Sequence, residues 1–420
     1  MILKTKFEKY GVTILYFATI AGLGFGFLGS VLNSKLLSKE HFGDWKYIQN
    51  YVMMTCFFVN FGVYFSGGRL IAATDDPKRI ATFKGYLIYQ SIVILLMMFI
   101  ITVAVGFFFQ KILSPGLFHL LMVMFPLFIV QPLMLYLETI FQAQRKLLSF
   151  SIYKVLPPFL YVTALFLFKS YSTGNIYFNA ILFYLTYLTV FVFFIFNDKV
   201  IFNKRSSELK ELIKENKEFG SHLYYGSLWN VGGIYLLPIL ISYFNINNIE
   251  VGNYSLALSF VIPFAFLPTI VGTSYFKEFI KIDKIPPQAF KKVFIVSIAL
   301  LALTFIGVDY IINIFLGDKY REVGFLVKIG AGGAIAQGFG DFINKFLSAK
   351  GKSRFIKNVA IFQGTIQIIV SIFLIKWFSA TGAVVAKNIS SFIYFICLYY
   401  YYHRNYIKIN STQKAEAPYP

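Results

Sequence analysis

Charged residues are scarce in this chain of 420 residues. Asp, Glu, Lys and Arg together make up 14% of it, against about 25% in an ordinary soluble domain. A soluble fold would need more polar side chains to cover its surface, so a soluble globular protein is excluded. Apolar residues make up 57% of the chain, including 50 Phe and 29 Tyr, which indicates a protein solvated by lipid.

Cysteine and histidine are also rare. The 2 cysteines, Cys56 and Cys397, both lie in apolar runs and have no metal-binding or disulfide spacing. The 4 histidines lie near the ends of apolar runs, and none belongs to a metal or nucleophile motif. The sequence therefore predicts no cofactor and no enzyme, although coupling of transport to an ion gradient stays open.

The formal net charge of +20 could indicate a nucleic-acid partner, but the basic residues lie between apolar segments along the whole chain. Loops rich in Lys and Arg stay on the cytoplasmic side of a membrane. Of the 39 basic residues, 28 fall on one predicted side, 8 on the other and 3 within spans. We therefore expect a multi-pass protein of the cytoplasmic (inner) membrane with both termini cytoplasmic, and no nucleic-acid partner.

The predicted fold class is an all-α integral membrane protein with about twelve transmembrane helices, because a membrane-spanning helix needs about 20 apolar residues. The apolar segments that satisfy this length are 11–32, 47–66, 86–109, 117–137, 152–168, 176–196, 222–243, 251–276, 290–312, 324–348, 356–376 and 381–402.

The predicted spans divide into two lobes of six helices. Residues 1–196 form the first lobe and residues 222–405 the second, while residues 406–420 are expected to be a disordered cytoplasmic tail. Residues 197–221 contain SSELKELIKENKEFG, in which apolar side chains share one helical face among charges. This segment is predicted to be a cytoplasmic amphipathic linker.

Short motifs recur in the two halves. FGDW in the first half resembles VGNY in the second, which aligns Gly43 with Gly252. A second pair of motifs aligns Ala143 with Ala349 at nearly the same offset. Six spans in each half would bring both halves into the membrane from the same side, so the two lobes are predicted to be a parallel repeat.

Ionisable residues within spans are costly and usually face a cavity or a partner. Asp341 and Lys345 are four residues apart on one predicted helix, so they could neutralise each other or belong to a site. Lys328 and Lys387 have no such partner on their own helices. They could extend to the membrane surface or enter a substrate cavity.

The segment that carries Lys328 is also rich in glycine, with GAGGAIAQGFG at residues 330–340. Small residues allow close packing of membrane helices. A bend in a flexible helix is the alternative interpretation, and the sequence leaves both open.

Several motifs resemble those of the O-antigen flippases, also called polysaccharide repeat-unit translocases, of the multidrug/oligosaccharidyl-lipid/polysaccharide exporter superfamily. The resemblance covers almost the whole chain, and the order of the motifs carries it. They are NSKLLSKEHFGDW (33–45), VGNYSLALSF (251–260), FLGDKY (315–320), KGKSRFIKNVAIFQGTIQIIVSIFLI (350–375) and TGAVVAKNIS (381–390).

The resemblance implies a V-shaped, MATE-like bundle that flips a polyprenyl diphosphate-linked oligosaccharide by alternating access, for O-antigen, lipopolysaccharide or capsule synthesis. A basic, partly hydrated cavity would suit the anionic diphosphate, so the candidate substrate-binding residues are Lys328, Lys387, Lys345, Asp341 and Lys35. The expected partners are this substrate and the lipid bilayer. We expect the protein to act as a monomer, with association to other polysaccharide-assembly proteins left open.

Two departures define the alternatives. Span one, 11–32, lacks the acidic residue that is typical of the drug-exporting relatives. It also lacks the basic residues expected in lipid II flippases, and Lys35 at its outer end is the nearest. A multidrug or other small-molecule exporter remains the main alternative. A lipid II flippase is less favoured, as is a membrane polysaccharide polymerase or ligase, because the predicted outer loops are short.

Overall fold

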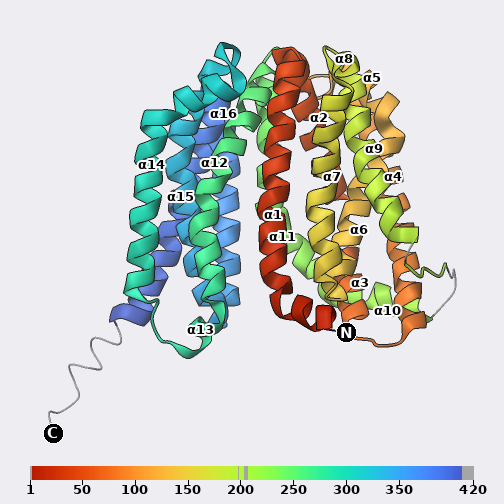
Figure 1. The fold of residues 1–420 in the computed structure, drawn as a ribbon, viewed down its shortest axis with the longest axis vertical. Coiled ribbons are helices and arrows are strands. Elements are labelled where there is room, and N and C mark those ends of the chain that lie inside the picture. The colour runs from red at the N-terminus through yellow and green to blue at the C-terminus, as the bar shows by residue number, and fades with distance from the viewer. Residues whose placement is uncertain (1, 197, 203–206, 409–420) are drawn as a thin grey trace, which may run out of the picture. The chain divides into compact units, whose positions relative to one another are not determined.

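Long apolar segments form helices because the membrane core offers no other hydrogen-bond partners for the backbone. A computed structural model of the protein describes residues 2–196, 198–202 and 207–408, and every regular element in these ranges is a helix (Figure 1). Within the described part of the chain, nine helices are long and apolar enough to span a membrane, or ten if a bent pair counts as one. The prediction of an all-α membrane protein is confirmed.

The chain divides into two compact units, residues 1–239 and 240–420, and the division lies within α11 (Ser221–Phe244) rather than in the predicted linker 197–221. The helices of the first unit are α1 (Ile2–Leu36), α2 (Lys39–Phe58), α3 (Val63–Ala72), α4 (Pro77–Phe108), α5 (Pro115–Met124), η1 (Phe125–Ile129), α6 (Val130–Ala143), α7 (Leu147–Leu167), α8 (Lys169–Ser172), α9 (Ile176–Phe196), α10 (Ser207–Glu215) and η2 (Asn216–Gly220).

The second unit continues from α11. Its helices are α12 (Ile249–Ser274), α13 (Phe276–Lys281), α14 (Pro287–Leu316), η3 (Asp318–Tyr320), α15 (Arg321–Ala349), α16 (Ser353–Tyr402) and η4 (His403–Lys408). The ordered helix η4 passes the predicted start of the tail at residue 406, because Tyr406 packs against Phe346 with ring centroids 5.1 Å apart. The rest of the predicted tail, 409–420, and residues 197 and 203–206 of the predicted linker lie outside the described residues.

The second predicted span, 47–66, is interrupted. It divides between α2 and α3, and the break contains two residues with positive φ, Phe61 at 50° and Gly62 at 81°. A side chain at Gly62 would be strained by this φ and would also collide with the backbone of Gly220 in η2. The break therefore allows the backbone of η2, which follows α10, to pack closely against the chain at Gly62.

The last two predicted spans, 356–376 and 381–402, both lie within α16. They are separated at Ser379, whose φ of 49° and ψ of −128° are not helical. The side-chain amide of Asn245 donates a hydrogen bond to the Ser379 hydroxyl at 2.8 Å. The connection between these spans is thus a sharp kink rather than a loop.

Each unit, taken alone, contains a helix end of the same design at the predicted repeat position. After Ala143, Arg145 adopts a φ of 52°, and the Lys146 amide donates to the Phe141 carbonyl at 2.9 Å. After Ala349, Gly351 adopts a φ of 71°, and Lys352 donates to Leu347 at 3.0 Å. This is the hydrogen-bond pattern of a helix closed by a left-handed residue, and its recurrence supports the parallel repeat. Superposition of the two lobes stays a prediction.

The sidedness of the protein can be tested with cysteines introduced at Lys284, Lys352 and Lys376, in a chain whose Cys56 and Cys397 are replaced. All three lysines are exposed. Because the charge bias places residues 284 and 352 inside, we expect an impermeant thiol reagent to label only residue 376 in intact cells, and all three after the membrane is opened. Labelling of residues 284 and 352 from outside would contradict the orientation.

Candidate functional site

Close packing of α12, α15 and α16 forms the centre of the second unit. The glycines of α15 make this approach possible. A Cβ atom at Gly338 would lie 2.6 Å from the Ala265 carbonyl oxygen, and one at Gly333 or Gly340 would overlap the side chain of Asn388 or Tyr394. The structure therefore favours the packing interpretation of the glycine-rich segment.

A cavity of about 260 Å³ lies among the same three helices. Its walls are mostly apolar, with residues such as Val261 and Phe266 from α12. The polar residues that line it are Thr269, Gln337, Asp341, Lys387 and Asn388. An apolar pocket with a few polar groups that converge on it is the usual form of a binding site.

Lys387 lines this cavity from the second half of α16. Its side chain is partly buried, and no carboxylate of the described residues forms an ion pair with it. An unpaired cation within an apolar wall is unfavourable unless an anion or water reaches it. Of the predicted cationic site residues, Lys387 is the one that the structure places at the cavity.

Asp341 also lines the cavity, but it does not pair with Lys345. Its carboxylate accepts hydrogen bonds from Tyr394 at 3.2 Å, Gln337 at 3.4 Å and Thr269 at 3.4 Å. Among the described residues Lys345 makes no direct ion pair with Asp341, although the two charges still attract each other, so both alternatives for this pair stay predictions. The partners on α12 and α16 hold the carboxylate toward the cavity, whereas Lys345 is not among the residues that line it.

Lys328, which has no partner on its own helix, finds one on a neighbouring helix. Its amine lies 2.5 Å from a carboxylate oxygen of Asp309 on α14, and it does not line the cavity. The two residues belong to neighbouring helices, so the spacing rules for one helix could not find the pair. Asp309 within the apolar run 290–312 was the available clue.

Lys35 is exposed in the last turn of α1. It belongs to the first unit, whereas every residue that lines the cavity belongs to the second. The candidate site residues therefore separate into two that line the cavity, Asp341 and Lys387, and three that do not, Lys35, Lys328 and Lys345.

Two polar groupings in the first unit were not predicted. Lys154 of α7 forms an ion pair with Glu138 of α6 at 2.5 Å. Lys46, which the sequence placed in an outer loop, belongs to α2 and donates to Ser30 at 2.9 Å and Gln49 at 3.2 Å.

Over the described residues, no cluster of three or more His, Cys, Asp or Glu could hold a metal ion.

The pairing of Lys328 with Asp309 predicts a small effect of its loss. The pair is partly exposed, and such pairs contribute about 0–1 kcal/mol. We expect Lys328→Met with Asp309→Asn to leave transport and folded yield within about fivefold of the native values, since 1.4 kcal/mol corresponds to tenfold. Transport measured per folded protein checks this, and a loss as large as that of a Lys387 variant would contradict it.

Comparison with known proteins identifies the family. The family described as "Polysaccharide biosynthesis protein" matches residues 9–276. The chain belongs to this family. None of the curated proteins compared with it matches.

Several solved structures of transporters are similar to this member of the polysaccharide biosynthesis protein family. The lipid II flippase MurJ, in an inward closed conformation, matches 96% of this chain and 90% of its own at a TM-score of 0.73 and 15% identity. An inward-facing multidrug resistance MATE family transporter of the MOP superfamily matches 94% of this chain and 96% of its own, at a TM-score of 0.65 and 11% identity. The eukaryotic MATE transporter AtDTX14 matches 97% of this chain and 98% of its own, at a TM-score of 0.56 and 13% identity. At these identities the likeness shows a shared fold, that of flippases and transporters.

Proposed function

We propose that the protein is a flippase that moves polyprenyl diphosphate-linked oligosaccharide repeat units across the cytoplasmic membrane by alternating access, for the synthesis of a surface polysaccharide such as O-antigen or capsule. It acts as a transporter and not as an enzyme. The observation that carries the proposal is Lys387, without an ion-pair partner among the described residues, in the wall of a mostly apolar cavity, in a chain of the polysaccharide biosynthesis family.

The chemistry of the substrate fits this site. A diphosphate loses hydration when it enters an apolar region, and a fixed ammonium replaces part of that lost solvation. At about 4 Å and an effective dielectric near 20, one such charge pair is worth of order 4 kcal/mol before desolvation is subtracted. An attraction of this size holds the headgroup and still allows its release.

The polar groups beside Lys387 support binding of a sugar. Gln337 and Asn388 line the same cavity with amide groups that donate and accept hydrogen bonds. Gln337 is itself positioned by Gln363, whose amide donates to it at 2.9 Å. We assign to these residues contacts with hydroxyl groups of the first sugar of the repeat unit.

Complementation tests the function. In a strain that lacks its repeat-unit translocase and assembles a matching substrate, the native chain should restore surface polysaccharide. The Lys387→Ala variant should restore less at equal protein level. Restoration of resistance to small cationic drugs without restoration of polysaccharide would instead identify a multidrug exporter.

A further inference from the structure

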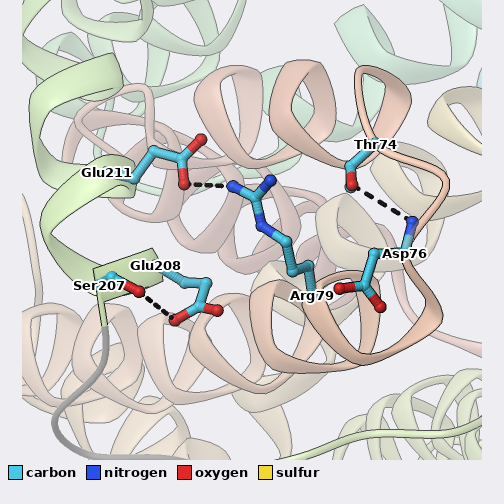
Figure 2. A network of polar contacts seen from close by, with 6 residues as sticks. All are labelled: Thr74, Asp76, Arg79, Ser207, Glu208 and Glu211. Atoms are coloured by element: carbon cyan, nitrogen blue, oxygen red, sulfur yellow. Dashed lines mark hydrogen bonds and ion pairs between the residues drawn. The ribbon is translucent and has the colours of Figure 1, made fainter.

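The linker helix α10 bridges the ends of α3 and α4 through two arginines. Arg69 of α3 lies 2.8 Å from a carboxylate oxygen of Glu215, and Arg79 of α4 lies 2.5 Å from one of Glu211. Figure 2 shows the Arg79 guanidinium extended toward Glu211, with Asp76 turned to the start of α4. There the Asp76 carboxylate accepts from the Lys78 amide at 2.9 Å, which occupies it in capping the helix.

The two glutamates fix the spacing of the two arginines. Glu211 and Glu215 are four residues apart on α10, so their Cβ atoms are about 5–6 Å apart on one face. Arg69 and Arg79 are thereby held at two adjacent points. The guanidinium fork binds phosphate with the same geometry as carboxylate. A pair of linked phosphate groups is therefore the ligand that this arrangement suits best.

The two ends of the linker are held with different strength. The ion pairs are open to water, with Arg69 57% and Arg79 39% exposed, so they contribute little to stability. In contrast, Asn216 of η2 donates to the Phe61 carbonyl at 3.2 Å, and Tyr224 donates to the Phe58 carbonyl at 2.6 Å. These bonds satisfy carbonyls at the break between α2 and α3. The charged end is therefore the weaker attachment, and its detachment exposes Leu212, the buried side chain of α10, while the other end stays anchored.

We propose that Arg69 and Arg79 form a docking site for the diphosphate of the substrate, and that Glu211 and Glu215 occupy this site until the substrate displaces them. The proposal rests on the proposed function and adds a first binding step to it. Displacement frees α10 while η2 remains on the break between α2 and α3.

Movement of α10 can be measured with spin labels at Ala73→Cys and Lys210→Cys, both exposed positions, in the full chain with Cys56 and Cys397 replaced. In nanodiscs of neutral phospholipid, a short-chain prenyl diphosphate should lengthen the distance between the labels, and the matching prenyl alcohol should not. An unchanged distance would overturn the proposal. Lengthening by phosphatidylglycerol alone would also overturn it, since the ligand would then be a membrane phospholipid.

Binding of the prenyl diphosphate supplies the second readout. Arg69→Gln with Arg79→Gln should weaken binding at least tenfold, whereas Lys78→Ala, which removes an exposed basic residue of the same helix turn, should bind as the native chain does. Glu211→Gln with Glu215→Gln should strengthen binding several-fold, because the competing carboxylates are gone. Equal binding by all of these variants would overturn the proposal.

Exchanging the charges of the Arg79–Glu211 ion pair distinguishes a docking site from a purely structural contact. Arg79→Glu with Glu211→Arg restores the ion pair but places a carboxylate where the phosphate should dock. We expect binding to stay at least tenfold weaker, whereas full recovery would show that the pair only fastens the linker. Flipping of lipid-linked oligosaccharide by the native chain, measured in parallel, distinguishes the failures. If the native chain flips the substrate but the arginine variants bind the prenyl diphosphate normally, this inference alone is wrong. If the native chain does not flip the substrate, the proposed function is wrong.

Discussion

Replacing Lys387 with alanine should reduce flipping about tenfold to a hundredfold, because a lost hydrogen bond to a charged group costs about 1.5–3 kcal/mol. Lys387 has no ion-pair partner among the described residues, so its removal leaves no buried carboxylate behind. The amount of folded protein should therefore stay near the native level. Initial flipping rates, divided by the amount of folded protein, measure the effect.

Lys387→Arg provides the matched control for this prediction. Arginine keeps the positive charge and can contact phosphate, so it should retain more activity than alanine, although its planar fork differs from an ammonium. Lys345→Ala, on a residue that does not line the cavity, should have a smaller effect. Equal rates for Lys387→Ala and the native chain would remove Lys387 from the site.

Replacing Gly338 with valine should strongly destabilise the second unit. The Cβ atom would lie 2.6 Å from the Ala265 carbonyl oxygen and 3.0 Å from its Cα atom, so α12 and α15 would have to separate. Excess volume in a packed core costs about 1–3 kcal/mol and sometimes more. Here the obstacle is backbone, which cannot rotate away as a side chain can. We expect a lower thermal midpoint and a lower yield of monodisperse protein.

Gly332→Ala is the control on the same helix. A Cβ atom at Gly332 meets no neighbouring atom within 4 Å, so alanine should be neutral or slightly stabilising. If both variants behaved alike, the glycines would act through helix flexibility and not through close packing. That outcome would restore the alternative of a bending helix.

Hydropathy predicted most of the fold because a membrane span leaves a long apolar run in the sequence. It could not predict the break between α2 and α3, which depends on the left-handed conformations of Phe61 and Gly62 and on polar groups from η2. It also could not predict that the helices on either side of Ser379 meet at a kink and not through a loop. These features arise from contacts between segments that are far apart in the chain.

The site was predicted in part. The position of Lys387 within a span allowed two placements, at the membrane surface or in a cavity, and the structure places it at the cavity. The partners of Asp341 were not accessible, since Tyr394 and Thr269 come from other helices. For the same reason the sequence did not show the partner of Lys328, since Asp309 is on α14. A helix pattern shows which residues share a face, but not which helix lies opposite.

The most direct test of the account is flipping by the purified native chain in vesicles that contain a fluorescent polyprenyl diphosphate-linked oligosaccharide. Accessibility of the sugar to a membrane-impermeant enzyme or quencher reports its movement between leaflets. We predict transfer that depends on the protein and falls about tenfold or more with Lys387→Ala. Vesicles in which the native, folded protein moves this substrate no faster than empty vesicles do would contradict the account.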